Sequence, residues 1–509
     1  MERKSYKNPA RIILLCLLVL MINSTIYAQR HTTARNLGLG GGGTAYMNDF
    51  HANFINPANL MLSESNATLG LLGGFSTNGG GQLADLSIYN EYFTTGRTIN
   101  ENLTLEISNK LFGNNPDGLR KIGFNVDAVL FGLNIKTKSQ AISVAFRMRA
   151  MGSFEVSKGL FELSLGGLNE SFFNEYKAVN LSGDVLTVGE VSLGYAREVW
   201  SAGNFGDRGS KRLFAGIAPK LLLGMNYYNT SFNSRLRVSE NDRMVSHIFD
   251  YQINTAGVIS EQLNDYHRDR NDINMDVEFD EYLSFEDAAP EMGSVQGTGL
   301  GVDLGVTYEM VMPAVSFLGD KQQLLRVSFS ATDLGSVNFD KAPGRFSANG
   351  QVDWSGLEMD YARIDSEFNS STSDYTSHVQ DSITNDVYGN FAPEEISAIK
   401  VGLNPMINLG ALYSAGKWNV MFDFGKGMNN RGMNSKRLSS VLGIEYNLAN
   451  VIPIRTGMRV GGALPTSYSF GTGLNFRFLE FTLGFMTASN PFDNSVNIGA
   501  AWSGLILRY

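Results

Sequence analysis

The stretch LGVDLGVTYEM, residues Leu300 to Met310, alternates between apolar residues and residues that are polar or small. The apolar positions are Leu300, Val302, Leu304, Val306, Tyr308 and Met310, and the positions between them hold Gly301, Asp303, Gly305, Thr307 and Glu309. Because successive side chains of a β-strand point to opposite faces, the stretch predicts a strand with one apolar and one polar face. It is longer than the strands of about five or six residues that are common in soluble domains.

The same period of two recurs along the chain. It appears in ISVAFRMRA (142–150), LRVSFSAT (325–332), WNVMFDFG (418–425) and LGIEYNL (442–448). We predict fourteen strands, near residues 64–75, 121–136, 140–155, 185–198, 212–227, 298–310, 322–337, 398–412, 416–425, 436–448, 453–461, 466–478, 480–488 and 495–509. Fourteen is an even number, as closure of an up-and-down barrel requires.

The gaps between the predicted strands alternate between short and long. Long gaps fall near 76–120, 156–184, 228–297 and 338–397, always at the same parity along the chain. Outer-membrane barrels carry short turns on the periplasmic rim and long loops on the outer rim. A sandwich has no reason to separate its loops in this way, so the gaps favour a barrel with four long outer loops.

The two ends of the chain indicate export to an outer membrane. Residues 1–28 have a basic start, an apolar run from Ile12 to Ile22 that is too short to span a bilayer, and a small residue before Gln29. We therefore expect a signal peptide over residues 1–28. At the other end, Leu505, Leu507 and Tyr509 share one phase of the last predicted strand, which is the pattern that barrel-assembly machinery recognises.

Composition excludes several classes of protein. The only cysteine, Cys16, lies inside the predicted signal peptide, so the exported chain can hold neither a disulfide scaffold nor a Cys-ligated metal. No stretch after residue 28 contains the roughly 20 apolar residues of a transmembrane helix. Glycine is abundant, with 55 residues, and charged residues make up 18%, below the usual quarter or so. The net charge of −9 argues against nucleic acid as a partner.

Together these features predict an all-β fold, a closed antiparallel transmembrane β-barrel of about fourteen strands in the bacterial outer membrane. Lipid offers no hydrogen-bond partners to backbone amides, and a closed barrel pairs all of them without leaving an edge. We expect the barrel to span residues 64–509, with outer-membrane lipid against its apolar face.

The segment NLGLGGGGTAYMNDFHANFINPANL (36–60) precedes the first predicted strand. A phosphate-binding loop would need a Gly-Lys-Ser/Thr sequence after the glycines and a strand-to-helix unit around them, and neither is present. The parts ARNLGLGGGGTA (34–45) and INPANL (55–60) resemble the start of mature chains in the FadL-like superfamily of outer-membrane long-chain fatty-acid transporters. That superfamily also contains PorV-like barrels of the type IX secretion pathway and many barrels of unknown function, and the chain looks most like the last group.

The resemblance implies that residues 29–63 fold inside the lumen as a plug. Glycine tolerates positive φ and brings backbone close to a crowded wall, and Asn-Pro favours a turn. The residues that carry the motif are Gly38, Gly40, Gly41, Gly42, Gly43, Asn56, Pro57 and Ala58. The outer loops near 228–297 and 338–397 are long and acidic, unlike those of a minimal fatty-acid channel.

Charged residues within the predicted strands fall on the phase that faces away from lipid. Because a cation at the bilayer midplane costs roughly 2–4 kcal/mol on the lipid face, we expect all of them to point into the lumen. They are Arg147, Arg149, Glu190, Asp303, Glu309, Arg326, Asp423, Glu445 and Arg477. They can line a path, or they can cross-link the wall and hold the plug, and the sequence leaves both readings open.

Chemistry of other kinds finds little support. The five histidines are scattered without metal-ligand spacing, and no G-x-S-x-G elbow is present. The acidic run between Asp272 and Glu291 is either a solvated loop or a binding surface for divalent cations. We predict no catalytic residue, no metal and no cofactor.

Three functions remain. The leading hypothesis is passive transport of hydrophobic or amphipathic small molecules, with capture at the outer loops and release through the wall or past the plug. The first alternative is a surface scaffold or secretion-pathway barrel that binds a protein partner at its outer loops without transport. The second is a lipid enzyme embedded in the barrel, with a Ser-His pair assembled from distant strands.

Overall fold

The computed structural model describes residues 33–94, 96, 98–204, 207–239, 244–270, 294–312, 323–354, 361–367, 375, 392–462, 466–489 and 495–509. The predicted signal peptide and the acidic run from Asp272 to Glu291 lie outside the described residues. No helix in the described part of the chain is long and apolar enough to cross a bilayer.

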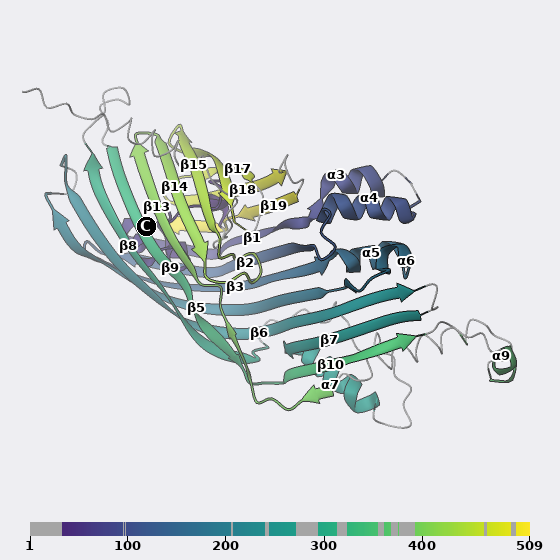
Figure 1. Ribbon diagram of the computed structural model, residues 1–509. Helices are drawn as coiled ribbons and strands as arrows, with labels where there is room; N and C mark the ends of the chain where they lie inside the picture. The colour runs from purple at the N-terminus through teal and green to yellow at the C-terminus, as the bar shows by residue number, and fades with distance from the viewer. Residues whose placement is uncertain are drawn as a thin grey trace, which may run out of the picture.

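A single antiparallel sheet closes on itself, and its ring contains fourteen strands within the described residues (Figure 1). In ring order they are β1 (Ala67–Asp85), β2 (Leu119–Lys136), β3 (Gln140–Ser157), β5 (Leu181–Ala202), β6 (Lys211–Ser239), β8 (Gly297–Met312), β9 (Gln323–Phe339), β13 (Met406–Ala415), β14 (Trp418–Gly427), β15 (Leu438–Leu448), β16 (Ile452–Gly461), β17 (Ser467–Asn475), β18 (Leu479–Ser489) and a last strand in two pieces, β19 (Ser495–Trp502) and β20 (Leu505–Arg508). A short strand, β12 (Ile399–Gly402), precedes β13 on the same edge of β9. The predicted fourteen-strand barrel is confirmed.

Closure occurs between the first and last strands. Phe75 of β1 pairs with Trp502 of β19, and Leu69 pairs with Leu507 of β20. The rings of Phe75 and Trp502 stack with their centroids 4.6 Å apart across this seam. The sheet therefore has no free edge within the ring, which is what a sheet in lipid needs.

The two faces of the strands differ as their alternation predicts. On β8, Leu300 is 73% exposed, whereas Asp303 and Glu309 on the other phase are buried. The apolar face therefore points out of the barrel and the polar face points into the lumen. An outward apolar surface on a closed barrel belongs in the outer membrane of a bacterium. Leu505 and Tyr509 also point outward and are 57% and 74% exposed; their recognition by assembly machinery stays a prediction.

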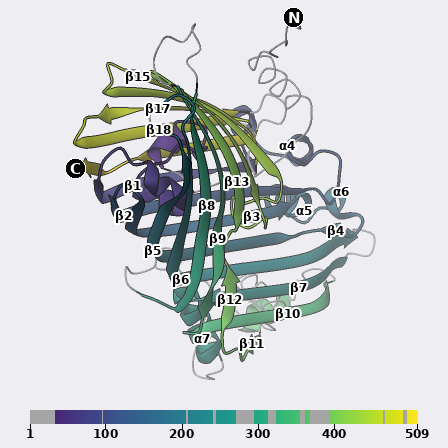
Figure 2. The ribbon, with the colours of Figure 1, turned by 90° about the vertical axis from the view of Figure 1, so that its left-hand side faces the viewer.

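One end of the barrel carries an extension that the sequence did not predict (Figure 1 and Figure 2). β1 and β6 continue beyond their predicted ends, and β6 pairs with β4 (Lys177–Ala178) and β7 (Met244–Ala256). β7 pairs in turn with β10 (Pro343–Trp354), which pairs with β11 (Ala392–Glu394). The ranges near 76–120, 156–184, 228–297 and 338–397 therefore contain strands as well as loops, because the backbone pairs with itself beyond the bilayer as well as within it. We call these paired strands and their helices the outer extension.

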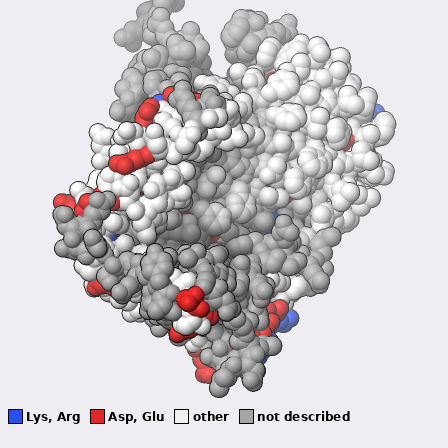
Figure 3. Space-filling view, turned by 90° about the vertical axis from the view of Figure 1, so that its right-hand side faces the viewer, with Lys and Arg blue, Asp and Glu red and all other residues white. Residues whose placement is uncertain are grey.

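Helices lie in the connections at the outer end. They are α3 (Leu86–Ile88), η3 (Tyr89–Phe93), α4 (Glu101–Phe112), α5 (Lys158–Gly166), α6 (Glu170–Phe173), α7 (Val258–Arg270) and α9 (Tyr361–Glu367). Of these, α9 stands apart from the sheet (Figure 1). At the opposite end of the barrel the connections are short; 137–139, 416–417 and 449–451 are examples. Figure 3 looks onto the outer end, where Asp and Glu side chains are scattered and few Lys or Arg are visible.

The N-terminal segment, residues 33–63, lies inside the barrel and forms the plug. It contains α2 (Ala34–Leu37) and the short helices η1 (Phe50–Phe54) and η2 (Pro57–Leu62), whose residues are all buried. Asn56 caps η2 by accepting a hydrogen bond from the Ala58 N–H at 3.2 Å, and Pro57 occupies the first helical position. Asn-Pro thus begins a helical turn, because proline fixes φ and needs no N–H partner there.

Candidate functional site: the plugged lumen and an outer apolar pocket

The glycine run of the plug forms a cradle for a carboxylate of the wall. The N–H groups of Gly43 and Thr44 donate to the two Asp423 carboxylate oxygens, each at 3.0 Å. Gly40, Gly41 and Gly43 have φ of 82°, 81° and 128°, values that side-chain-bearing residues rarely adopt. Successive amides pointing at one anion form the concavity that also binds phosphate elsewhere. The run therefore binds an anion, and that anion is the Asp423 carboxylate of β14.

Other hydrogen bonds and an ion pair, that of Arg35 with Glu480, fix the plug around the ring. They join Asn53 to Ser143 of β3 (3.1 Å), Asn56 to Thr307 of β8 (3.0 Å), Tyr46 to Glu445 of β15 (2.5 Å) and Arg35 to Glu480 of β18 (3.1 Å). Because these contacts reach strands on several sides of the lumen, the plug is attached to the whole ring rather than to one part of the wall.

Glycines of the ring strands line the wall where it contacts the plug. A methyl group added at Gly457 would lie 2.3 Å from the Leu39 carbonyl carbon, and one at Gly305 would lie 1.8 Å from the Asn56 side-chain oxygen. Eleven described wall glycines approach the plug in this way: Gly70, Gly73, Gly132, Gly194, Gly216, Gly305, Gly410, Gly443, Gly457, Gly471 and Gly484. We call this set the glycine girdle. It explains the glycine at luminal positions such as Gly305 in the stretch 300–310.

Above the plug, ionised side chains fill the lumen. Arg147 and Arg149 contact Glu190 at 2.7 and 2.6 Å, and Lys220 contacts Asp303 at 2.7 Å. Asp333 joins them, 2.8 Å from Arg149 and 2.9 Å from Lys220. The Phe54 ring of the plug lies beneath, 4.1 Å from the Arg147 guanidinium carbon. These six charged residues, the lumen cluster, link the wall to the plug.

The structure places most of the predicted luminal residues inside the barrel. Arg147, Arg149, Glu190, Asp303, Glu309, Asp423 and Glu445 are buried, and half-buried Arg326 contacts Glu309 at 2.5 Å. Arg477 was predicted wrongly. It is exposed in the turn between β17 and β18, where Phe476 and Leu479 exchange main-chain hydrogen bonds. The predicted strand 466–478 ends at Asn475, so Arg477 belongs to neither face.

Several charged side chains of the lumen were not among the residues predicted from the sequence. Lys220 follows Pro219 in a run that does not alternate, and Asp333, with φ of 58°, lies within the register shift of β9 between Ala331 and Leu334. Where the alternation of apolar and polar residues is interrupted, the sequence no longer shows which positions face the lumen. Glu480 and Arg455 do alternate with apolar neighbours, and that pattern could have identified them.

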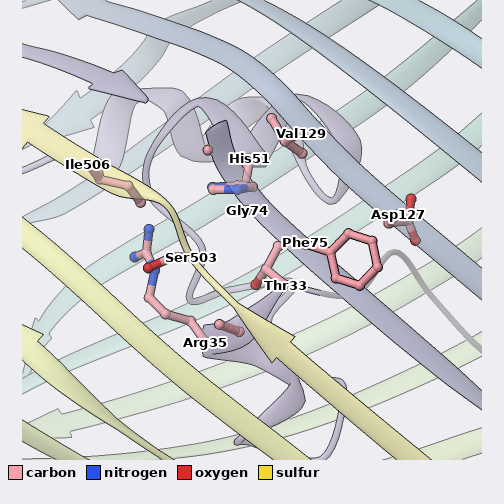
Figure 4. A pocket seen from close by; sticks show the side chains of 11 residues that line it. Thr33, Arg35, His51, Gly74, Phe75, Asp127, Val129, Ser503 and Ile506 are labelled. Atoms are coloured by element: carbon pink, nitrogen blue, oxygen red, sulfur yellow. The ribbon is translucent and has the colours of Figure 1, made fainter. Parts of the chain in front are cut away.

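The wall is irregular where it meets η1. β1 shifts register between Leu71 and Gly74, and the last strand breaks between Trp502 and Leu505. Beside this interruption lies a cavity of about 10 Å³, lined by Arg35, His51 and Ser503 among others (Figure 4). It has room for about one water molecule.

His51, which lines this cavity, pairs with Asp49 in a way that resembles a catalytic dyad. The His51 Nδ1 atom lies 2.9 Å from the Asp49 carboxylate. However, the Ser503 hydroxyl accepts a hydrogen bond from the Thr482 N–H at 2.7 Å, and the cavity is too small for an ester substrate. Burial, and next the Arg35 charge, lower the His51 pKa to about 3, which makes its imidazole a weak base.

His51 makes plug docking sensitive to acid. A folded-state pKa of about 3, below the ordinary 6.5, leaves stability complete above pH 6.5 and reduces it as the pH falls toward 3. At pH 5 the loss is roughly 2 kcal/mol. We expect thermal unfolding in detergent, followed by circular dichroism, to shift to lower temperature between pH 7.5 and pH 5 in wild type. His51→Gln should reduce that shift; an equal shift in both proteins would contradict the prediction.

A large apolar pocket lies in the outer extension. Its volume is about 470 Å³, and Leu160, Leu163 and Leu168 from α5 and the chain after it form one side. The sheet supplies the rest: Val179, Leu181, Phe232, Ser234, Leu236, Val245, His247, Tyr251, Val352 and Trp354. None of the described residues that line it is charged at neutral pH, because burial lowers the His247 pKa. The His247 Nε2 atom and the Tyr251 hydroxyl lie 3.1 Å apart.

At the opposite end, beneath the plug, a polar cavity of about 290 Å³ is lined mainly by ion-paired and amide side chains. They include Arg35, Glu445, Arg455, Glu480 and Arg508. The lumen is thus polar below and above the plug, and the apolar pocket stands apart from it.

Comparison with solved structures finds several outer-membrane transporters at low identity. The Ralstonia pickettii toluene transporter TbuX is 12% identical with a TM-score of 0.43, and the match covers 94% of this chain and 99% of that one. The Pseudomonas putida toluene transporter TodX and a Pseudomonas aeruginosa FadL homologue are each 10% identical with TM-scores of 0.38, over 95% of this chain and 99% of theirs. No curated protein sequence matches the chain. A family model described as a family of unknown function, DUF5723, matches residues 57–488, and the chain belongs to this family.

Proposed function

We propose that the protein takes up hydrophobic or amphipathic small molecules across the outer membrane and captures them first in the outer apolar pocket. The observation that carries this proposal is the pocket itself. Its volume of about 470 Å³ falls within the range of roughly 300–1,000 Å³ that is typical of small-molecule sites. Its lining is aliphatic and aromatic with a few polar atoms, which is the composition of such sites.

The position of the pocket suits capture from outside the cell. It lies on the part of β6 that pairs with β7, beyond the part that pairs with β8 in the ring. A ligand can therefore enter it without crossing the bilayer. The wall interruption beside η1 supports release toward the membrane, because fewer main-chain pairs hold β1 to its neighbours there.

Binding of N-phenyl-1-naphthylamine, a neutral fluorophore, to the detergent-purified protein tests capture. We expect saturable binding in wild type and at least a tenfold weaker affinity in Val352→Glu, which places a carboxylate inside the pocket. Gln351→Glu is the matched control, since the neighbouring residue of β10 points to the other face. Absence of saturable binding in wild type, or equal affinities of the two variants, would overturn the proposal.

A second candidate, a surface scaffold that does not transport, is favoured by the filled lumen. The plug and the lumen cluster occupy the interior. Of the two cavities described at the plug, the one beside η1 is too small and the one beneath the plug is too polar to pass a hydrophobic ligand. Uptake of the same fluorophore into proteoliposomes separates the candidates. Saturable binding with no uptake would favour the scaffold, whereas uptake that falls in Val352→Glu would favour transport.

A further inference from the structure

The connection between β14 and β15, residues 428–437, folds inward and crosses the lumen. Met433 in its middle is buried. In the ring, β2, β3 and β5 stand on the opposite side from β14 and β15. The segment contacts all three: Lys121 of β2 donates to the Asn430 carbonyl, Gly432 faces Gly152 of β3, and Arg431 pairs with Asp184 of β5.

The contacts on the near side are hydrogen bonds to main-chain carbonyls, and they include one from the Arg431 guanidinium to the Gly402 carbonyl of β12 at 2.6 Å. The Met428 N–H donates to the Pro405 carbonyl at 2.9 Å, and the Asn434 amide donates to the same carbonyl at 3.3 Å. The Asn429 amide reaches the Leu403 carbonyl at 3.1 Å. These bonds attach both ends of the segment to the link between β12 and β13, where a hinge would lie.

The contacts on the far side are of another kind. The Arg431 Nε atom lies 2.8 Å from an Asp184 carboxylate oxygen, and both side chains keep some exposure. Met433 lies against Gly123, where an added methyl group would be 2.6 Å from its sulfur. Within the described residues, no hydrogen bond between two main-chain atoms joins the segment to β2, β3 or β5, and the Asn430 carbonyl accepts only from the Lys121 side chain. The Met433 side chain is flexible and packs here against glycine backbone, so it can move away without displacing another side chain.

The segment stands between the outer end and the lumen cluster. On β2 the chain runs from the outer end inward, and the contact residue Gly123 comes four residues before Asp127, which lies 3.6 Å from Arg147. At about 3.3 Å per residue this separation is roughly 13 Å. Beneath the segment is a polar cavity of about 30 Å³, lined by Asn125, Asp127 and Asn434 among others.

We propose that residues 428–437 form an outer gate of the lumen, hinged at β12–β13 and latched to the opposite wall by the Arg431–Asp184 pair. The lumen then has two closures, this gate at the outer side and the plug at the inner side. Opening the gate exposes the luminal face of β2 to the outside while the plug stays in place. The proposal is independent of which ligand, if any, the outer pocket binds.

Cysteine labelling in intact cells tests the gate. The only native cysteine is Cys16, in the predicted signal peptide, so Asn125→Cys beneath the segment provides a single reactive site. A membrane-impermeant maleimide added outside should label it slowly. Arg431→Gln and Asp184→Asn, each combined with N125C, should both increase the labelling rate at least tenfold. The charge-swapped pair R431D/D184R should return it toward the N125C rate.

Two controls make the result decisive. Lys436→Gln removes a charge from an exposed position of the same segment and should leave the rate unchanged. Asp117→Cys, on an exposed outer turn, gives the unobstructed rate. Folding of each variant is checked by heat-modifiable migration. The gate is overturned if folded R431Q and D184N variants label at the N125C rate, or if N125C itself labels as fast as D117C.

Discussion

Replacing Asp423 by alanine is expected to release the plug from β14. The substitution removes both acceptors of the Gly43 and Thr44 N–H groups and leaves these two amides buried without a partner. Hydrogen bonds to a charged group contribute about 1.5–3 kcal/mol each, so the docking of the plug should weaken by roughly 3–6 kcal/mol. A plug cysteine, Ala45→Cys, should become reactive toward a soluble maleimide in the purified protein.

The cradle offers a specific rescue. Without the carboxylate, the glycine amides form an empty anion site of about the size of formate, so added formate should lower the reactivity of the D423A plug again, whereas chloride at equal ionic strength should not. Asp423→Asn, which keeps one acceptor oxygen, should show an intermediate effect. If D423A leaves the Ala45→Cys reactivity unchanged, the glycine run has a role other than holding this carboxylate.

Valine at Gly457 is expected to prevent the plug from seating. The added atoms would meet the Leu39 carbonyl carbon at 2.3 Å and the Gly40 nitrogen at 2.4 Å, and both belong to backbone that cannot rotate away. Overpacking of this kind costs about 3 kcal/mol or more, and here the whole plug has to move. We expect the yield of heat-modifiable barrel in the outer membrane to fall severalfold.

Gly402→Val is the matched control, because nothing but the Gly335 carbonyl oxygen, 4.0 Å away, comes near a methyl group at Gly402. It should assemble with a yield close to that of wild type. Truncation of residues 33–45 in the G457V background should restore assembly if the clash with the plug is the whole cause. A G457V yield equal to that of G402V would show that the plug tolerates side chains in the girdle.

The barrel could be predicted from the sequence because its physical cause repeats in every strand. One face meets lipid and the other meets the lumen, so alternation marked most of the fourteen strands, including the last one with Leu505, Leu507 and Tyr509, although the run around Lys220 in β6 does not alternate. The plug was predicted from the Gly38–Gly43 and Asn56–Ala58 motifs through their resemblance to known chains. The partner of the glycines was not, since Asp423 is 380 residues away from Gly43 and only the closed ring brings them together.

Other features were missed for different reasons. The strands of the outer extension do alternate, and Phe249 and Tyr251 of β7 and Phe346 of β10 pack with Leu263 of α7 on one face. They lie within two of the long gaps between the fourteen predicted strands, and those gaps were assigned to outer loops. Residues 428–437 contain three Asn and no alternating apolar residues, and they give the same local pattern whether they fold outward or inward. Only the position of Asp184 across the lumen decides that Arg431 turns inward.

The contacts of the plug also fix the order in which the molecule is made. The first residues of the exported chain fit against β14 to β18, which are among the last strands to be synthesised and delivered to the membrane. The amino-terminal segment therefore has to wait, undocked, until nearly the whole polypeptide has arrived, and the joining of β1 to β19 and β20 then seals it in. Assembly of this protein therefore ends when the closing barrel encloses the amino-terminal segment.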